Sequence, residues 1–128
     1  MDTGRGSAAQ PMVLSLSFLL LLLLLSKFAG ESATFTVGEG AGWTFDAVSW
    51  PNGKHFNAGD VLEFKYSPAA HNVVEVNAGG YRDCSTPARA KVFESGNDRI
   101  TLRRGANYFI CSFSGHCEAG MKVAVIAA

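Results

Sequence analysis

The chain has 128 residues, 48% of them hydrophobic, and its 11 basic and 11 acidic residues give a formal net charge of zero at pH 7. This balance argues against a nucleic acid or an anionic membrane as the partner, because both select proteins with a strong positive charge. Without a leader, the length is that of one small domain.

The first predicted element is an N-terminal leader. Val13 to Leu25 is an apolar run made mostly of leucine. It is too short to span a bilayer comfortably and has the length of the apolar part of a secretory signal peptide. Small residues at Gly30 and Ser32 provide a cleavage site before Ala33, so residues 1–32 are predicted to be removed. An uncleaved signal anchor is the alternative.

Removal of the leader would leave residues 33–128 as one secreted domain. The leader carries two basic and two acidic residues, so the remaining domain keeps a formal charge of zero. No second long apolar stretch and no lipid-anchor signal follow. We therefore expect a soluble extracellular monomer without a membrane anchor.

Beyond Ala33, short β-rich stretches alternate with turns that contain glycine, proline and asparagine. In residues 61–66, for example, Leu62, Phe64 and Tyr66 share one face of a predicted strand. Residues 81–93 are less regular, with a short helical turn expected near Cys84–Pro87. About seven or eight strands with regularly spaced turns predict an all-β Greek-key sandwich or barrel. The other predicted strands lie at residues 34–37, 72–76, 98–103, 107–111 and 122–126.

Near the C-terminus, Cys111, His116 and Met121 follow one another at equal spacing. A thiolate, an imidazole and a weak thioether form a ligand set that suits copper cycling between two oxidation states. Such a site needs a second imidazole. His71 is preferred because it precedes an apolar strand, whereas His55 lies in a polar turn. The sequence therefore predicts one type 1 copper ion held by His71, Cys111, His116 and Met121.

The positions of these residues on the predicted strands also bear on function. Cys111 ends one strand and Met121 begins the next, so the ligands would lie at one end of a rigid sandwich. Little movement between oxidation states favours fast electron transfer. Gly115 and Gly120 flank two of the ligands and allow the backbone to bend closely around the metal.

The same residues allow other interpretations. Taken singly, each is more often a core methionine, a satisfied histidine or a spare cysteine, but their joint spacing favours a site. Zinc is a rival metal, although it prefers carboxylate to thioether ligands. A copper oxidase would need an open coordination position, and none is obvious. We therefore expect a non-enzymatic carrier of single electrons with an unidentified redox partner. The alternative function is an extracellular matrix or signalling interaction in which copper is incidental.

Three cysteines in a secreted domain cannot all pair, so one thiol stays unpaired and must be protected from oxidation. Copper ligation by Cys111 would protect it, because a coordinated thiolate is shielded and held deprotonated. The disulfide would then join Cys84 to Cys117. A local Cys111–Cys117 disulfide, with Cys84 free, is the alternative.

Five motifs occur together along the chain beyond Ala33: Val37–Trp43, Trp50–Pro51, Phe56–Asp60, His71–Val74 and Cys111–Met121. Together they resemble the phytocyanins, a family of plant blue copper proteins. The resemblance covers residues 33–128 and implies a cupredoxin fold, type 1 copper, a disulfide between Cys84 and Cys117, and secretion to the plant extracellular matrix. It also implies that His71, Cys111, His116 and Met121 are the copper ligands.

Within that family, the chain is similar to the plantacyanin branch. Met121 stands where stellacyanin-type members have glutamine, and no tail rich in proline and serine follows the domain. Members of the plantacyanin branch are often strongly basic, whereas this domain is formally neutral. No acidic redox partner is therefore inferred.

Overall fold

The computed structural model describes residues 15–23 and 31–128, and the chain divides into two compact units, residues 1–31 and 32–128. In the first unit, residues 15–23 form an exposed α-helix. A search of the described residues finds no helix with the length and apolar character that crossing a membrane requires. Residues 1–14 and 24–30 of the predicted signal peptide lie outside the described residues, and its cleavage before Ala33 stays a prediction.

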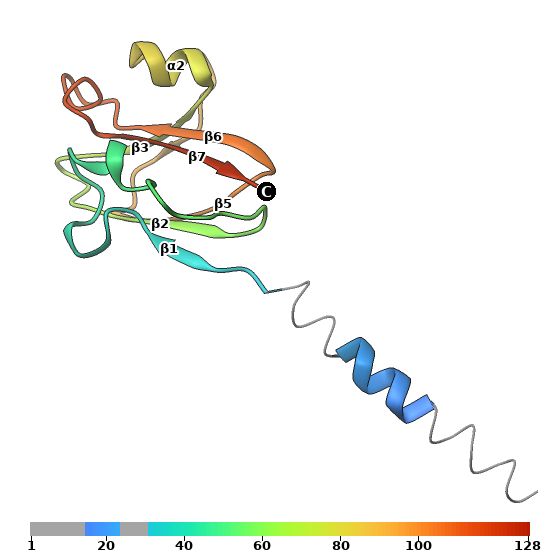
Figure 1. Ribbon diagram of the computed structural model, residues 1–128. Coiled ribbons are helices and arrows are strands. Elements are labelled where there is room, and N and C mark those ends of the chain that lie inside the picture. Colours follow the sequence, from blue (N-terminus) through green and yellow to red (C-terminus); the bar gives the residue numbers. More distant parts are fainter. Residues whose placement is uncertain (1–14, 24–30) are drawn as a thin grey trace, which may run out of the picture. The chain divides into compact units, whose positions relative to one another are not determined.

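The second unit is a sandwich of two β-sheets, shown as its upper and lower layers in Figure 1. This arrangement confirms the predicted all-β fold. The three-stranded sheet has the order β1-β2-β5, in which β1 and β2 are parallel. The four-stranded sheet has the order β4-β3-β6-β7 and is antiparallel throughout. The strands are β1 (Thr34–Thr36), β2 (Val61–Lys65), β3 (Val73–Val76), β4 (Val92–Phe93), β5 (Asn97–Thr101), β6 (Gly105–Ile110) and β7 (Lys122–Ala127).

Alternating apolar residues from both sheets form the core between the layers. Leu62 and Phe64 on β2 are fully buried, as the period-2 pattern predicts. The Phe64 ring lies edge-on to Trp43 at 5.0 Å and 5.3 Å from the Phe109 ring on β6. Full burial of one such side chain stabilises the fold by roughly 1.5–3 kcal/mol. This packing joins the two sheets into a rigid support.

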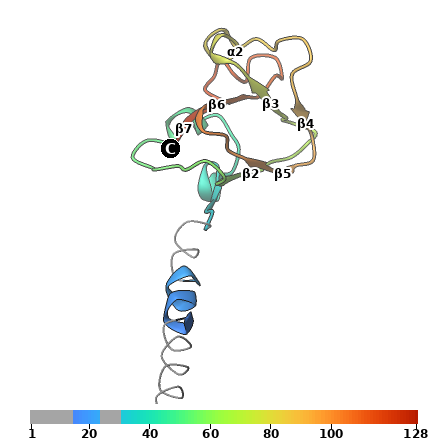
Figure 2. The same ribbon diagram turned by 90° about the vertical axis from the view of Figure 1, so that its right-hand side faces the viewer.

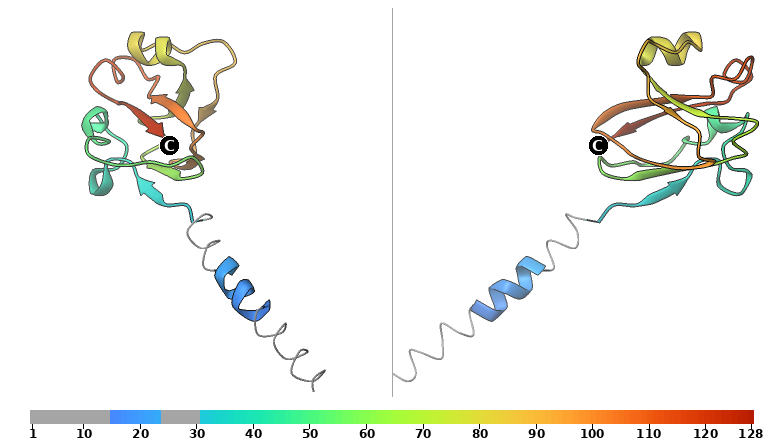
Figure 3. Two further views of the ribbon diagram at one scale, coloured as in Figure 1. Left: turned by 45° about the vertical axis from the view of Figure 1, so that its right-hand side comes forward. Right: turned by 180° about the vertical axis from the view of Figure 1, so that it is seen from behind.

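The helix α2 (Ala78–Asp83) corrects the prediction of a helical turn near Cys84–Pro87. The Asn77 side chain caps the helix by accepting a hydrogen bond from the Gly80 N–H at 2.8 Å. Cys84 ends it in the left-handed conformation, with φ of 53°. Gly79 and Gly80 give this segment a low helix propensity, but the cap and the contacts with β3 and β6 outweigh it. Figures 2 and 3 show α2 on the outer side of the four-stranded sheet.

Two short 3-10 helices, η1 (Glu39–Ala41) and η2 (Ala47–Ser49), interrupt the long connection between β1 and β2. The η2 segment contacts β7, and the Val48 N–H donates to the Gly120 carbonyl at 3.2 Å. This connection therefore lies against the segment that leads into β7.

Three strand ends meet at one end of the four-stranded sheet. β6 runs antiparallel to both β3 and β7, and Ile110 is in register with a residue of each. The residues that precede β3, follow β6 and precede β7 therefore lie side by side. His71, Cys111 and Met121 occupy these three places.

Candidate metal centre

The fold brings His71, Cys111 and His116 together, and their ligand atoms all lie within 4.8 Å of one another. The two histidine Nδ1 atoms are 3.1 Å apart, and the Cys111 Sγ is 3.5 Å from the Nδ1 of His116. Donors bound about 2.0–2.3 Å from a shared metal ion lie roughly 3–4 Å from each other. The three side chains therefore fit a single bound ion. His55, the alternative candidate for the second imidazole, is exposed and is not part of this group.

Met121 is fully buried beside these residues, and backbone hydrogen bonds fix its position. Its N–H donates to the His116 carbonyl at 3.0 Å, and its carbonyl accepts from the Cys111 N–H at 3.0 Å. Met121 and Cys111 also belong to the same buried apolar cluster. The thioether would complete the two-imidazole, one-thiolate donor set that is typical of blue copper sites.

The site lies between the core and the solvent. Cys111 is fully buried, whereas His71 and His116 are half-buried. Burial, and then the charge of His116, lower the pKa of His71, which favours the neutral imidazole that binds metals. The Nδ1 atoms of the two histidines face each other. The Nε2 edge of each ring therefore points away from the other histidine.

Asn72 connects the His71 segment to the Cys111 segment. Its side-chain amide donates to the Ser112 hydroxyl at 2.8 Å, and its side-chain oxygen accepts from the Ser112 N–H at 2.8 Å. The Asn72 carbonyl in turn accepts from the Trp43 indole N–H at 2.8 Å. Asn72 is buried, so these bonds satisfy polar groups that have no access to water.

The Phe45 ring packs against both histidines. Its ring centroid is 5.8 Å from that of His71 and 5.0 Å from that of His116, both in edge-on geometry. Gly120 makes this approach possible, because a Cβ there would lie 2.4 Å from the Phe45 carbonyl oxygen. Phe113 lies on His116 as well, with ring centroids 5.7 Å apart.

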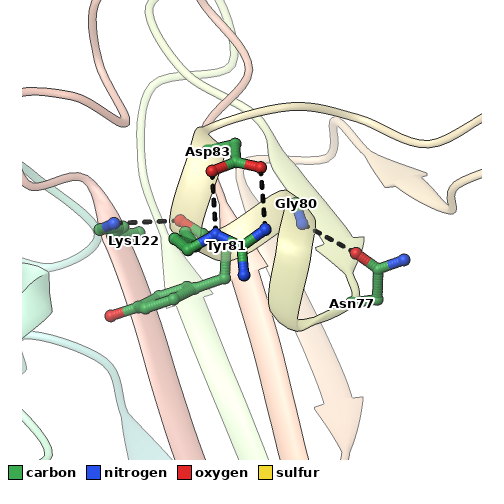
Figure 4. A network of polar contacts seen from close by, with 6 residues as sticks. Asn77, Gly80, Tyr81, Asp83 and Lys122 are labelled. Atoms are coloured by element: carbon green, nitrogen blue, oxygen red, sulfur yellow. Dashed lines mark hydrogen bonds and ion pairs between the residues drawn. The ribbon is translucent and has the colours of Figure 1, made fainter.

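A disulfide joins Cys84 to Cys117, and Cys111 is the free, buried cysteine. The alternative Cys111–Cys117 disulfide is therefore not formed. The bridge ties the end of α2 to the loop that carries His116. Near the other end of that loop, the Lys122 ammonium donates to the Tyr81 carbonyl at 3.0 Å and lies 4.4 Å from the Tyr81 ring (Figure 4). Helix α2 thus holds the segment 116–122 at two points.

Reasoning from the sequence missed the residues that support the ligand atoms. Asn72 and Ser112 directly follow His71 and Cys111, and that adjacency is the only local signal for them. Phe45 comes from a separate connection, so no spacing along the chain could have indicated its contact with the histidines. Partners of this kind become visible only when the tertiary structure is known.

Comparisons with known proteins agree with this geometry. Residues 43–121 match the family model of the plastocyanin-like domain. The chain is 55% identical over 128 residues to chemocyanin of Lilium longiflorum, and the match covers 100% of both chains.

Two solved structures also resemble this chain, and each is covered completely by 75% of it. Cucumber basic protein, a blue copper protein, is 57% identical with a TM-score of 0.74. Spinach plantacyanin is 51% identical with a TM-score of 0.67. The matched part of this chain therefore spans the full length of both solved chains.

Proposed function

Because this chain belongs to the phytocyanin family of blue copper proteins, within its plantacyanin branch, we propose that it is a secreted carrier of single electrons. The observation that carries the proposal is the convergence of His71, Cys111 and His116, with ligand atoms within 4.8 Å, beside the buried Met121. We propose these four residues as the ligands of one copper ion. Bound copper would supply one-electron chemistry between its Cu(II) and Cu(I) states.

The protein's part in this function is to hold the donor atoms still. The Asn72–Ser112 pair and the Cys84–Cys117 disulfide fix the three segments that supply the donors. A site whose geometry barely changes between oxidation states has little reorganisation to undergo when an electron moves. The rigid sandwich therefore favours rapid electron transfer over binding of a substrate.

The ring of His116 is half-buried, so part of it reaches the solvent beside the candidate metal centre. Phe45 and Phe113 lie on this ring and are 39% and 36% exposed. Their apolar surface would exclude water from a contact with a redox partner and allow close approach. We propose that electrons enter and leave through this ring.

The donor set also favours a carrier over an enzyme. An enzyme acting on oxygen or an organic substrate at copper needs an open coordination position. Three strong donors and a buried thioether leave no such position in the proposed site. Residues 33–128 would perform this function outside the cell, after removal of the leader.

A redox titration of residues 33–128, copper-loaded and with the disulfide intact, tests the proposal. We expect one electron per protein, complete reversibility over repeated cycles, and a visible band that bleaches on reduction. The Cys111→Ser variant, which keeps a similar shape, should lose the band and the reversible wave. A titration that consumes more than one electron, or drifts from cycle to cycle, would contradict a simple carrier.

A further inference from the structure

The Asp60 carboxylate forms a hydrogen bond with the backbone at the start of the folded domain. The Ala33 N–H donates to Asp60 Oδ1 at 2.9 Å, and the Asn57 N–H donates to Oδ2 at 2.8 Å. The Ala33 carbonyl accepts from the Val61 N–H at 2.9 Å, so Ala33 is held on both sides of its Cα. Asp60 itself is only 3% exposed. These contacts fix the first residue before β1 on the turn that precedes β2.

The turn that presents this carboxylate is held by other parts of the fold. The Asp60 carbonyl accepts from the Leu102 N–H at 2.7 Å, and the Gly59 N–H donates to the Leu102 carbonyl at 2.9 Å. The Ala58 N–H donates to an oxygen of Ala128 at 2.9 Å. The carboxylate is therefore positioned independently of Ala33.

Both hydrogen bonds to the Asp60 carboxylate come from neutral backbone groups. No ion pair among residues 15–23 and 31–128 includes Asp60. The basic residues on the adjoining strands are engaged elsewhere, since Arg99 on β5 lies 2.9 Å and Lys65 on β2 lies 3.5 Å from the Glu63 carboxylate. A buried carboxylate without a cation is costly, because burial removes the hydration that stabilises its charge.

We propose that Asp60 is the acceptor for the new N-terminus produced by processing, and that cleavage before Ala33 completes this site. This inference rests on the proposed removal of residues 1–32. Hydrolysis of the Ser32–Ala33 peptide bond adds water, leaves the carboxylate on Ser32, and gives Ala33 a primary amine. That amine is protonated at neutral pH, since α-amino groups have pKa values near 7.7–8.0.

The existing hydrogen bond then becomes an ion pair without any rearrangement of the chain. The Ala33 nitrogen already lies at hydrogen-bonding distance from Oδ1, so processing changes its charge and leaves its position unchanged. A charge-assisted hydrogen bond is roughly twice as strong as a neutral one. Processing would therefore strengthen the attachment of β1 to the sheet. The mature domain would then be more stable than the same domain with a blocked amine.

The test compares residues 33–128 bearing a free Ala33 amine with the same chain acetylated at that amine. Acetylation keeps the N–H donor, as in the unprocessed chain, and removes the charge. We expect acetylation to lower the folding equilibrium constant roughly tenfold in urea unfolding. In the Asp60→Asn background the effect should fall below about twofold. Asp98→Asn, which alters another buried carboxylate, should leave the tenfold effect in place.

Two further measurements keep the proposal falsifiable if Asp60→Asn fails to fold. The pKa of the Ala33 amine, followed by NMR in the free-amine protein, should lie above its ordinary range. A pKa within that range, or an acetylation effect of the same size in both backgrounds, overturns the ion pair. Mass spectrometry of the protein secreted from plant cells should find Ala33 first. Any other first residue overturns the processing step but leaves the proposed copper function untouched.

Discussion

Asn72 and Ser112 exchange two hydrogen bonds of 2.8 Å each across 40 residues of sequence. Each directly follows a residue of the candidate metal centre, His71 in one case and Cys111 in the other. The pair therefore fixes the separation of an imidazole and a thiolate that belong to different strand ends.

Replacing Asn72 should loosen this connection. Asn72→Ala removes both hydrogen bonds to Ser112, each of which contributes roughly 0.5–1.5 kcal/mol, so we expect a loss of roughly 1–3 kcal/mol in the free energy of unfolding. The visible band of the copper-loaded protein should broaden, because the donor atoms become less fixed. Ser112→Ala keeps the backbone N–H bond and should cost less. Equal losses in the two variants would show that the backbone bond contributes nothing.

The disulfide should contribute strongly to stability. Cys84 and Cys117 are 33 residues apart, and closing a loop of that length stabilises a fold by roughly 3–4 kcal/mol in the chain-entropy model. The Cys84→Ala, Cys117→Ala double variant should therefore unfold at much lower denaturant concentration. Measuring the metal-free forms by urea unfolding separates this effect from copper binding. A loss below about 1 kcal/mol would mean that α2 and its contacts hold the loop alone.

Local signals in the sequence explain which parts of the structure could be predicted. Strand alternation in β2 and β7, and the spacing of Cys111, His116 and Met121, are properties of short segments, so they are readable without a structure. The helix α2 was missed because its glycines favour a turn, while its stability comes from a side-chain cap and from packing on the sheet. The contact of Phe45 with the histidines depends on the path of a long connection, which no local pattern specifies.

Two glycines of the ligand loop should respond differently to substitution. Gly115 and Gly120 both have positive φ, 79° and 102°, which costs an alanine about 1–2 kcal/mol. A Cβ at Gly115 meets nothing within 4 Å, whereas one at Gly120 lies 2.4 Å from the Phe45 carbonyl oxygen. Gly120→Ala should therefore cost clearly more stability than Gly115→Ala and should disturb the copper spectrum. Thermal unfolding of both metal-free variants checks the order, and the reverse order would refute the steric argument.

Stability at alkaline pH should depend on Tyr66. Its hydroxyl lies within hydrogen-bonding reach of the Phe93 carbonyl and the Asp98 carboxylate. Burial, and then the hydrogen bond to Asp98, raise the pKa of Tyr66 above its ordinary value of 10.0. Above about pH 10 the unfolded tyrosine loses its proton while the folded one keeps it, so the free energy of unfolding falls as pH rises. Below that pH this contribution is fully present.

Urea unfolding between about pH 9 and 11 measures this dependence, because that range brackets the ordinary tyrosine pKa of about 10. Tyr66→Phe should remove part of the alkaline slope. Burial, and then Tyr108, also raise the pKa of Tyr81. Because the groups that shift Tyr81 differ from those that shift Tyr66, Tyr81→Phe should leave the Tyr66 part of the slope intact. An unchanged slope in Tyr66→Phe would show that the hydroxyl titrates alike in both states.

The visible absorption spectrum of the Cu(II)-loaded protein, compared with that of Cys111→Ser, tests the central claim most directly. If His71, Cys111 and His116 bind one copper ion, the protein will show an intense blue thiolate-to-copper band at one copper per chain. The band will be absent in Cys111→Ser. A weak spectrum typical of ordinary cupric sites, the same in both proteins, would show that Cys111 is not a ligand and would contradict the account.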